Sequence, residues 1–222
     1  MQSPSHLSAC ALHAGRWEGL RKGIKAMKRI LINLTAIAVY ALIFNFPVLA
    51  AKSPPLKGAA LPEINLAIPS KHSDRIYLGL PASGFFKIDE IKAKVVIIEI
   101  FSMYCPHCQK GALEVNELYQ EIENNPSLKG KIKLIGIGSG NSPYEVEIFR
   151  KTYDIPFPLF ADGDFSIHKV LGEVRTPYFI GVKINDDGTH QVFYSRLGGI
   201  KEADQFLKVI LQLSELAQGG AK

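Results

Sequence analysis

The sequence of 222 residues predicts an α/β fold with three layers, in which helices cover both faces of a mixed β-sheet. Two observations lead to this prediction. Strand-like and helix-like segments alternate along the chain after residue 70, and the last two strand-like segments form a hairpin that is followed by a helix. Alternation favours parallel strands, whereas a hairpin pairs antiparallel, so the sheet is expected to contain both.

The first elements are predicted from apolar runs and turn signals. A short strand is expected at Arg75–Leu80 (RIYLGL), followed by a turn at Pro81–Gly84. Ala93–Ser102 (AKVVIIEIFS) is rich in β-branched residues and apolar on both faces, which is typical of a central strand in a covered sheet. Apolar residues at roughly helical spacing follow Cys105 and stop before Pro126, which predicts a helix.

A second strand and helix are expected next. The strand is predicted at Lys131–Gly140. The helix has a defined start, because Ser142 can cap it, Pro143 suits its first turn and Glu145 completes a Ser-x-x-Glu capping box. The remaining elements are a short strand, a short helix, the two hairpin strands and an amphipathic closing helix, expected at residues 155–164, 165–172, 176–184, 190–197 and 201–216.

The N-terminus resembles an export signal. A positive stretch at Met27–Arg29 precedes an apolar run at Ile30–Phe46, and small residues allow cleavage after Ala50. We expect translation to start at Met27; an uncleaved membrane anchor is the alternative, because the apolar run is about long enough to span a bilayer. The expected parts are an N-terminal extension with the signal, a linker or extended arm, the main α/β domain and a tail, at residues 1–50, 51–69, 70–217 and 218–222.

The net charge of +5 belongs to the N-terminal segment. Residues 1–50 hold six Lys or Arg against one Glu, so residues 51–222 hold 20 basic and 20 acidic residues. The exported part therefore has no excess of basic residues to support nucleic-acid binding, and no nucleic acid is expected as a partner.

Two of the three cysteines lie together in FSMYCPHCQK (Phe101–Lys110), and Cys10 lies upstream of the signal. A structural disulfide framework would use several cysteines scattered along the chain. A zinc site needs about four ligands, and a c-type haem needs His where the chain has Gln109. A redox-active dithiol of Cys105 and Cys108, with neither metal nor cofactor, is the remaining interpretation.

Cys105 is the candidate nucleophile. It lies between a buried strand and a helix, where free backbone N–H groups and the helix dipole favour the thiolate. Pro106 fits the first helical turn, and Cys108, one turn further on, should be more buried. His107 can give the Cys105 thiolate a hydrogen bond or a positive charge, which stabilises the reduced form and makes a Cys105–Cys108 disulfide a stronger oxidant.

The order strand, Cys-x-x-Cys, helix and a later Thr176–Pro177 before a hairpin resembles the thioredoxin fold. The motif itself resembles the DsbA-like disulfide oxidases of the periplasm. The chain as a whole is more similar to exported TlpA/ResA-like proteins and their peroxiredoxin relatives in the AhpC/TSA superfamily, which have an extra β-α unit between the cysteines and a cis-proline. Cys105 and Pro177 are 72 residues apart, which leaves room for this unit at Lys131–Tyr153.

The resemblance implies roles for four further residues. Glu99 matches a buried acid beneath the cysteine pair, whose raised pKa would let it shuttle a proton for Cys108. Pro177 matches the cis-proline, and the backbone of Thr176 would pair with an extended substrate segment. Tyr104 stands where the family often has Trp and would contact partners.

The predicted function is thiol–disulfide exchange outside the cytoplasm, in the periplasm or its equivalent. The expected partners are exported proteins with thiols or disulfides and a membrane or periplasmic redox protein; the membrane itself is contacted only if the N-terminal segment is uncleaved. His107 and an oxidising compartment favour an oxidase or isomerase. The TlpA/ResA-like layout instead favours a reductant, for example one serving apocytochrome cysteines before haem attachment.

Two other functions stay open from the sequence. Peroxide reduction is one, because Ser102-x-x-Cys105 partly matches the peroxidatic motif, although Ile98 stands in place of its proline. A redox-regulated peptide-binding or chaperone module, with its groove around Thr176, is the other.

Overall fold

The computed structural model describes residues 53–216 and six isolated helical residues between Gly23 and Asn33. The chain divides into two units, Met1–Ala50 and Ala51–Lys222, and the second contains all the elements below. The expected signal run at Ile30–Phe46 lies almost wholly outside the described residues, as do its cleavage site and the tail. Among the described residues, no helix is both long and apolar enough to cross a membrane.

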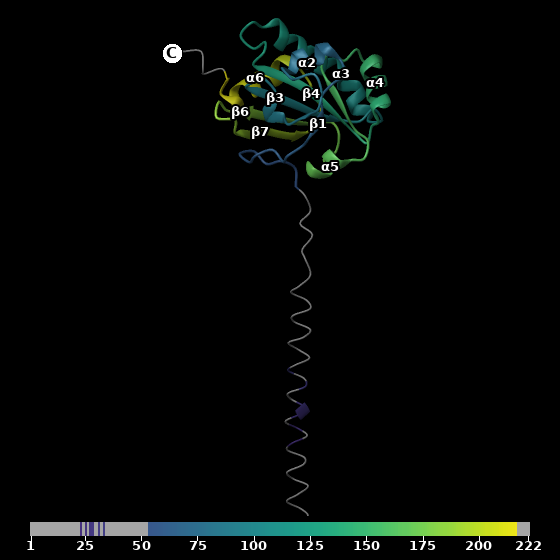
Figure 1. The fold of residues 1–222 in the computed structure, drawn as a ribbon, viewed down its shortest axis with the longest axis vertical. Coiled ribbons are helices and arrows are strands. Elements are labelled where there is room, and N and C mark those ends of the chain that lie inside the picture. Colours follow the sequence, from purple (N-terminus) through teal and green to yellow (C-terminus); the bar gives the residue numbers. More distant parts are fainter. Residues whose placement is uncertain are drawn as a thin grey trace, which may run out of the picture. The chain divides into compact units, whose positions relative to one another are not determined.

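Five strands lie side by side in one mixed sheet, in the order β5-β4-β3-β6-β7 (Figure 1). The central strand β3 (Val95–Phe101) pairs parallel with β4 (Ile132–Ser139) and antiparallel with β6 (Tyr178–Ile184). At the edges, β5 (Leu159–Asp162) pairs parallel with β4, and β7 (His190–Leu197) pairs antiparallel with β6. The expected combination of parallel strands and a terminal hairpin is therefore confirmed.

Both faces of β3 are covered, and all seven of its residues are buried. Val95, Ile97 and Phe101 pack in the core beneath three helices, and the intervening apolar residues pack in a second core on the opposite face. The three helices are α3 (Pro106–Asn124), α4 (Pro143–Thr152) and α6 (Ala203–Ser214). Since side chains alternate along a strand, Glu99 belongs to the face that α3 covers.

The opposite face is covered by short elements. These are β1, α2, β2, a 3₁₀-helix η1 and α5, at Leu66–Ala67, His72–Leu78, Phe85–Phe86, Ile88–Glu90 and Ser166–Val170. The helix at α5 matches its expected position, and the extra β-α unit is present as β4 and α4, between α3 and β5.

The strand expected at Arg75–Leu80 is wrong, because these residues belong mostly to helix α2. The buried side chains of this helix are Asp74 and Leu78, which are four residues apart and so lie on one helical face. Gly79 ends the helix in the left-handed conformation, with φ of 69°. A six-residue apolar window is too short to separate a strand from the end of a helix.

The N-terminal arm, residues 53–69, is part of the domain core. Leu61, Ile64 and Leu66 are each at most 4% exposed and lie in the core opposite α3. The backbone of the arm also pairs with β7, because the Gly58 N–H donates to the Val192 carbonyl at 2.8 Å. The arm therefore covers part of the edge strand.

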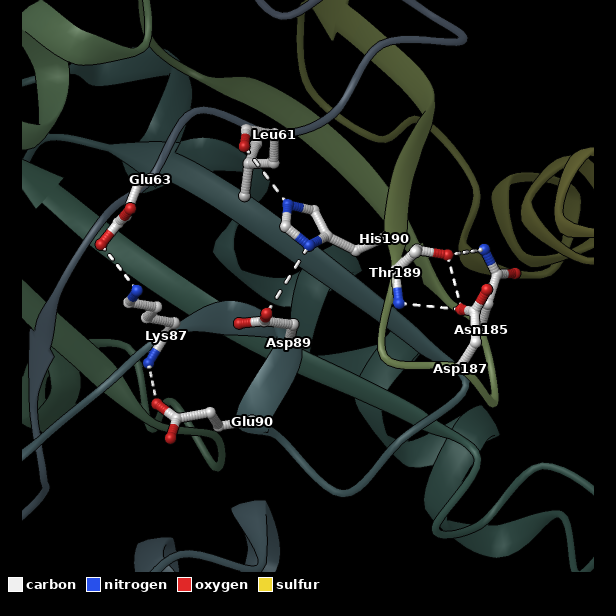
Figure 2. Close-up of polar contacts among 9 residues, drawn as sticks. All are labelled: Leu61, Glu63, Lys87, Asp89, Glu90, Asn185, Asp187, Thr189 and His190. Carbon is white, nitrogen blue, oxygen red and sulfur yellow. Dashed lines mark hydrogen bonds and ion pairs between the residues drawn. The ribbon is translucent and has the colours of Figure 1, made fainter.

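Polar contacts fasten the same arm to the elements beside it (Figure 2). The imidazole of His190 lies between the Leu61 carbonyl, 3.3 Å from Nε2, and the Asp89 carboxylate, 3.8 Å from Nδ1. An ion pair of 2.7 Å joins Lys87 to Glu63. These contacts link the arm to β7 and to the segment around η1.

We expect Leu61→Ala to lower the free energy of unfolding by about 2 to 5 kcal/mol, because it empties a buried leucine site in the core. Urea unfolding of the two full-length proteins measures this. The matched control is Leu56→Ala in the same arm, whose side chain is 67% exposed and should cost less than about 0.5 kcal/mol. Equal losses in both variants would contradict the role of the arm in the core.

Candidate active site

Cys105 lies at the junction of the central strand and the helix that follows it. It is the N-cap residue of α3, with extended backbone, and Pro106 occupies the first helical turn. The Cys108 backbone N–H donates to the Cys105 Sγ at 3.4 Å. The sulfur thus takes the place of a capping oxygen at a helix N-terminus, where negative charge is stabilised.

Thr176 and Pro177 lie against this sulfur although they are distant in sequence. Tyr178 pairs with Ile100 in the sheet, so the residues just before β6 lie beside those that follow β3. The Thr176–Pro177 peptide bond is cis, as predicted. The Cys105 Sγ lies 3.4 Å from the Thr176 carbonyl oxygen, to which the thiol can donate.

The surroundings of Cys105 lower its pKa. Desolvation is the largest single effect and raises the pKa, but several hydrogen bonds together outweigh it. They come from the Thr176 side chain, from Cys108 and from the backbone N–H of His107. His107 is exposed and borders a hollow together with Thr176, and its backbone N–H is one of the groups that lower the pKa of Cys105; the expected contribution of its imidazole stays a prediction.

Cys108 has the opposite environment. It is 1% exposed on the buried face of α3, as predicted. Desolvation raises its pKa most, and the hydrogen bond with Cys105 and the charge of Glu99 raise the pKa further. Both cysteines are free thiols in this structure, so the Cys105–Cys108 disulfide stays a prediction for the oxidised state.

Glu99 is the buried acid that the resemblance implied. It is 5% exposed, and desolvation raises its pKa to about 8, with a further contribution from the negative charge of Cys105. Its own charge raises the pKa of Cys108. The three groups therefore influence one another's protonation.

Two side chains that sequence reasoning did not assign to the site hold the loop between β3 and α3, residues 102–105, here called the active-site loop. Asn141 is completely buried, and its Oδ1 accepts the Met103 N–H at 2.8 Å. The Gln109 Nε2 donates to the Met103 carbonyl at 2.7 Å. Both backbone polar groups of Met103 are thus fixed by side chains, and only the position of Asn141 beside the capping Ser142 could have hinted at this.

Tyr104 is 66% exposed beside the nucleophile, consistent with a partner-facing position. Its hydroxyl donates to Glu145, which belongs to the predicted capping box with Ser142. The extra β-α unit therefore touches the active-site loop twice, at Met103 and at Tyr104.

Two hollows flank the Arg175–Thr176 segment. One has a volume of about 720 Å³ and lies between the start of α3, Pro177 and the loop after β7. The other has a volume of about 410 Å³ and is bordered by Tyr104 and Phe165. Among the described residues, no group of three His, Cys, Asp or Glu side chains is placed to hold a metal ion.

A strand, a Cys-x-x-Cys helix start, a buried acid and a cis-proline meet here, and together they define a protein of the thioredoxin-fold class. The chain matches the AhpC/TSA family over residues 80–194, about half of its length. It belongs to that family.

Curated relatives match part of the chain. A thiol-disulfide oxidoreductase ResA from Bacillus thuringiensis subsp. konkukian is 28% identical over 92 residues, which is 41% of this chain and 50% of the relative. A second ResA, from Halalkalibacterium halodurans, is 22% identical over 126 residues, 56% of this chain and 66% of the relative. The chain thus spans about half to two thirds of the length of these proteins.

Solved structures support the fold. A structure assigned as thiol:disulfide interchange protein DsbE from Chlorobium tepidum has a TM-score of 0.54 at 14% identity, covering 72% of this chain and 99% of that one. A structure assigned as a protein disulfide isomerase from Bacteroides thetaiotaomicron also has a TM-score of 0.54, at 15% identity, covering 75% and 92%. The predicted thioredoxin fold is confirmed.

Burial of Glu99 should make stability depend on pH. Its pKa is raised from 4.5 to about 8, so the folded state keeps a proton that the unfolded state loses, and stability falls as pH rises through this window. The comparison uses a Cys105→Ser background, in which that thiolate cannot form. Between about pH 5 and pH 7 the unfolding free energy should fall by about 2 kcal/mol more with Glu99 present than in the Glu99→Gln variant. Denaturant unfolding at each pH measures it; parallel curves for the two proteins would contradict the raised pKa.

Loss of the Asn141 side chain should loosen the active-site loop. Asn141→Ala leaves the Met103 N–H without its acceptor, which we expect to cost about 1 to 3 kcal/mol of unfolding free energy. Chemical denaturation measures the loss. Asn124→Ala is the matched control, because Asn124 is exposed at the end of α3 and should change stability by less than about 0.5 kcal/mol. A neutral Asn141→Ala would show that the loop is held by other contacts.

Proposed function

We propose that this protein is a thiol–disulfide oxidoreductase that exchanges disulfides with partner proteins through Cys105 and Cys108. The observation that supports it most is the asymmetry of the pair. Cys105 is accessible and has a lowered pKa, whereas Cys108 is buried one turn away and has a raised pKa. An attacking thiol needs access and thiolate character, and a resolving thiol needs protection until the mixed disulfide forms.

The proposed reaction consists of two thiol–disulfide exchange steps. The Cys105 thiolate attacks one sulfur of a partner disulfide, so a Cys105–partner bond forms, the partner disulfide breaks and the released partner thiolate takes up a proton. Cys108 then loses its proton and attacks the Cys105 sulfur, which releases the second partner thiol and forms the Cys105–Cys108 disulfide. Two electrons pass to the partner, and the reverse sequence oxidises a partner dithiol.

Glu99 is the proposed proton acceptor for Cys108. Cys108 has a raised pKa and cannot attack as a neutral thiol, so it needs a base within the protein. Glu99 is buried on the same side of β3 as α3, and its pKa of about 8 allows it both to take and to return a proton near neutral pH.

Whether the protein oxidises or reduces its partners depends on the relative stability of the dithiol and disulfide forms of Cys105 and Cys108. The hydrogen bonds that lower the pKa of Cys105 stabilise the reduced form, so they make the disulfide more oxidising than it would be without them. Equilibration with glutathione measures this balance. A strongly oxidising value assigns the protein to the oxidases or isomerases, and a strongly reducing one to the reductases.

We further propose that the domain works outside the cytoplasm on exported proteins. The positive stretch at Met27–Arg29 followed by the apolar run Ile30–Phe46 supports export. N-terminal sequencing of the protein recovered from cell fractions tests it. A mature chain that begins near Ala51 supports cleavage, and one that retains the apolar run supports an anchor.

Single cysteine variants test the proposed chemistry. Cys105→Ser should abolish reduction of a disulfide substrate, because no attacking thiolate is left. Cys108→Ser should accumulate mixed disulfides, visible by mass spectrometry, because the resolving thiol is missing. Full turnover by Cys105→Ser would refute the proposal, and rapid consumption of hydrogen peroxide by Cys105 would favour a thiol peroxidase instead.

A further inference from the structure

The groove beside the nucleophile is lined by positive charge. It has a volume of about 720 Å³, and Thr176, which contacts the Cys105 sulfur, forms part of its wall. The side chains of Lys110, Arg175 and Lys201 line it, and all three residues are exposed. Residues 51–222 as a whole carry equal numbers of basic and acidic residues, so this concentration is local.

These three cations have no partner within the described residues. None of their side chains takes part in an ion pair or hydrogen bond there. Other lysines do have carboxylate partners; Lys87 contacts Glu63 (Figure 2) and Lys208 contacts Asp204. The charges around the groove are therefore available to an occupant.

The remaining lining of the groove suits a polypeptide. Pro177 and Ile200 are buried residues of its wall, and Leu197 is 43% exposed there. Glu114 is the one acid among the described lining residues, and its Oε2 is buried without a hydrogen-bond partner. The apolar residues of the wall can contact side-chain carbons of a bound segment.

We propose that this groove binds an acidic, extended segment of the partner protein, next to the cysteine that reacts with Cys105. The inference rests on the proposed function, because the groove adjoins a dithiol whose substrate must carry sulfur. Among the described lining residues, three cations without a carboxylate partner against one acid favour carboxylate side chains on this segment. The groove thus selects among disulfide partners by charge.

Two disulfide-containing peptides test the proposal. They differ only in the residues that flank the cysteines, which are Glu in one and Lys in the other. The reduced full-length protein should react about tenfold faster with the Glu peptide at low salt, since several exposed charge pairs act together. The preference should shrink toward one at about 1 M salt, where the screening length is about 3 Å.

Variants locate the preference in the groove. Lys201→Glu reverses one charge in the loop after β7, so the ratio of the two peptide rates should fall several-fold. Because both peptide rates are measured on the same variant, their ratio does not depend on any change in the reactivity of Cys105. Lys129→Glu is the matched control, because Lys129 follows the C-terminal end of α3, whereas Cys105 caps its N-terminal end. With this variant the ratio should equal that of the wild type.

The outcomes separate the two proposals. The neutral 2-hydroxyethyl disulfide reports on dithiol exchange alone. Reaction with it but equal rates with the two peptides, or an unchanged ratio in Lys201→Glu, overturns the acidic-segment proposal and leaves the proposed function intact. Failure to react with the neutral disulfide or with either peptide overturns the proposed function and the inference together.

Discussion

The pairing of β3 on both of its edges is the constraint on which this site depends. Phe101 pairs with Gly138 of β4, and Ile100 pairs with Tyr178 of β6. The chain that leaves β4 and the chain that enters β6 must therefore meet where β3 ends. Asn141 reaches the active-site loop from one side and the cis Thr176–Pro177 peptide reaches it from the other, with Cys105 between them.

Different degrees of burial give Cys105, Cys108 and Glu99 different protonation behaviour where these segments meet. Cys105 keeps access to solvent, and hydrogen bonds outweigh its desolvation, so its thiolate is favoured. Cys108 lies on the buried face of α3 and Glu99 lies on the face of the sheet that α3 covers, and desolvation favours the neutral forms of both. One helix start thus holds a reactive thiol and a protected one, because Cys105 caps the helix at the end of β3 and Cys108, one turn further on, is on the buried face of the helix.

The extra β-α unit supports the same loop. Close packing of β4 beneath α4 requires glycine at Gly138, where a Cβ atom would come within 2.9 Å of Val146. This packing brings Asn141 to Met103 and Glu145 to Tyr104. The unit therefore helps to shape the surface around Tyr104, while the groove is lined by the start of α3, the segment at Arg175–Pro177 and the loop between β7 and α6.

The sequence by itself determined the order of most elements, the cysteine pair and its place at a helix start, because these depend on local periodicity and capping. Through the resemblance it also identified Glu99 and the cis bond at Pro177. Only the tertiary structure decided that Arg75–Leu80 is mostly helical, that the His107 backbone N–H contacts the Cys105 sulfur and that Asn141 holds Met103. It also gathered Lys110, Arg175 and Lys201 around one groove, because residues far apart in sequence become neighbours only when the strands pair.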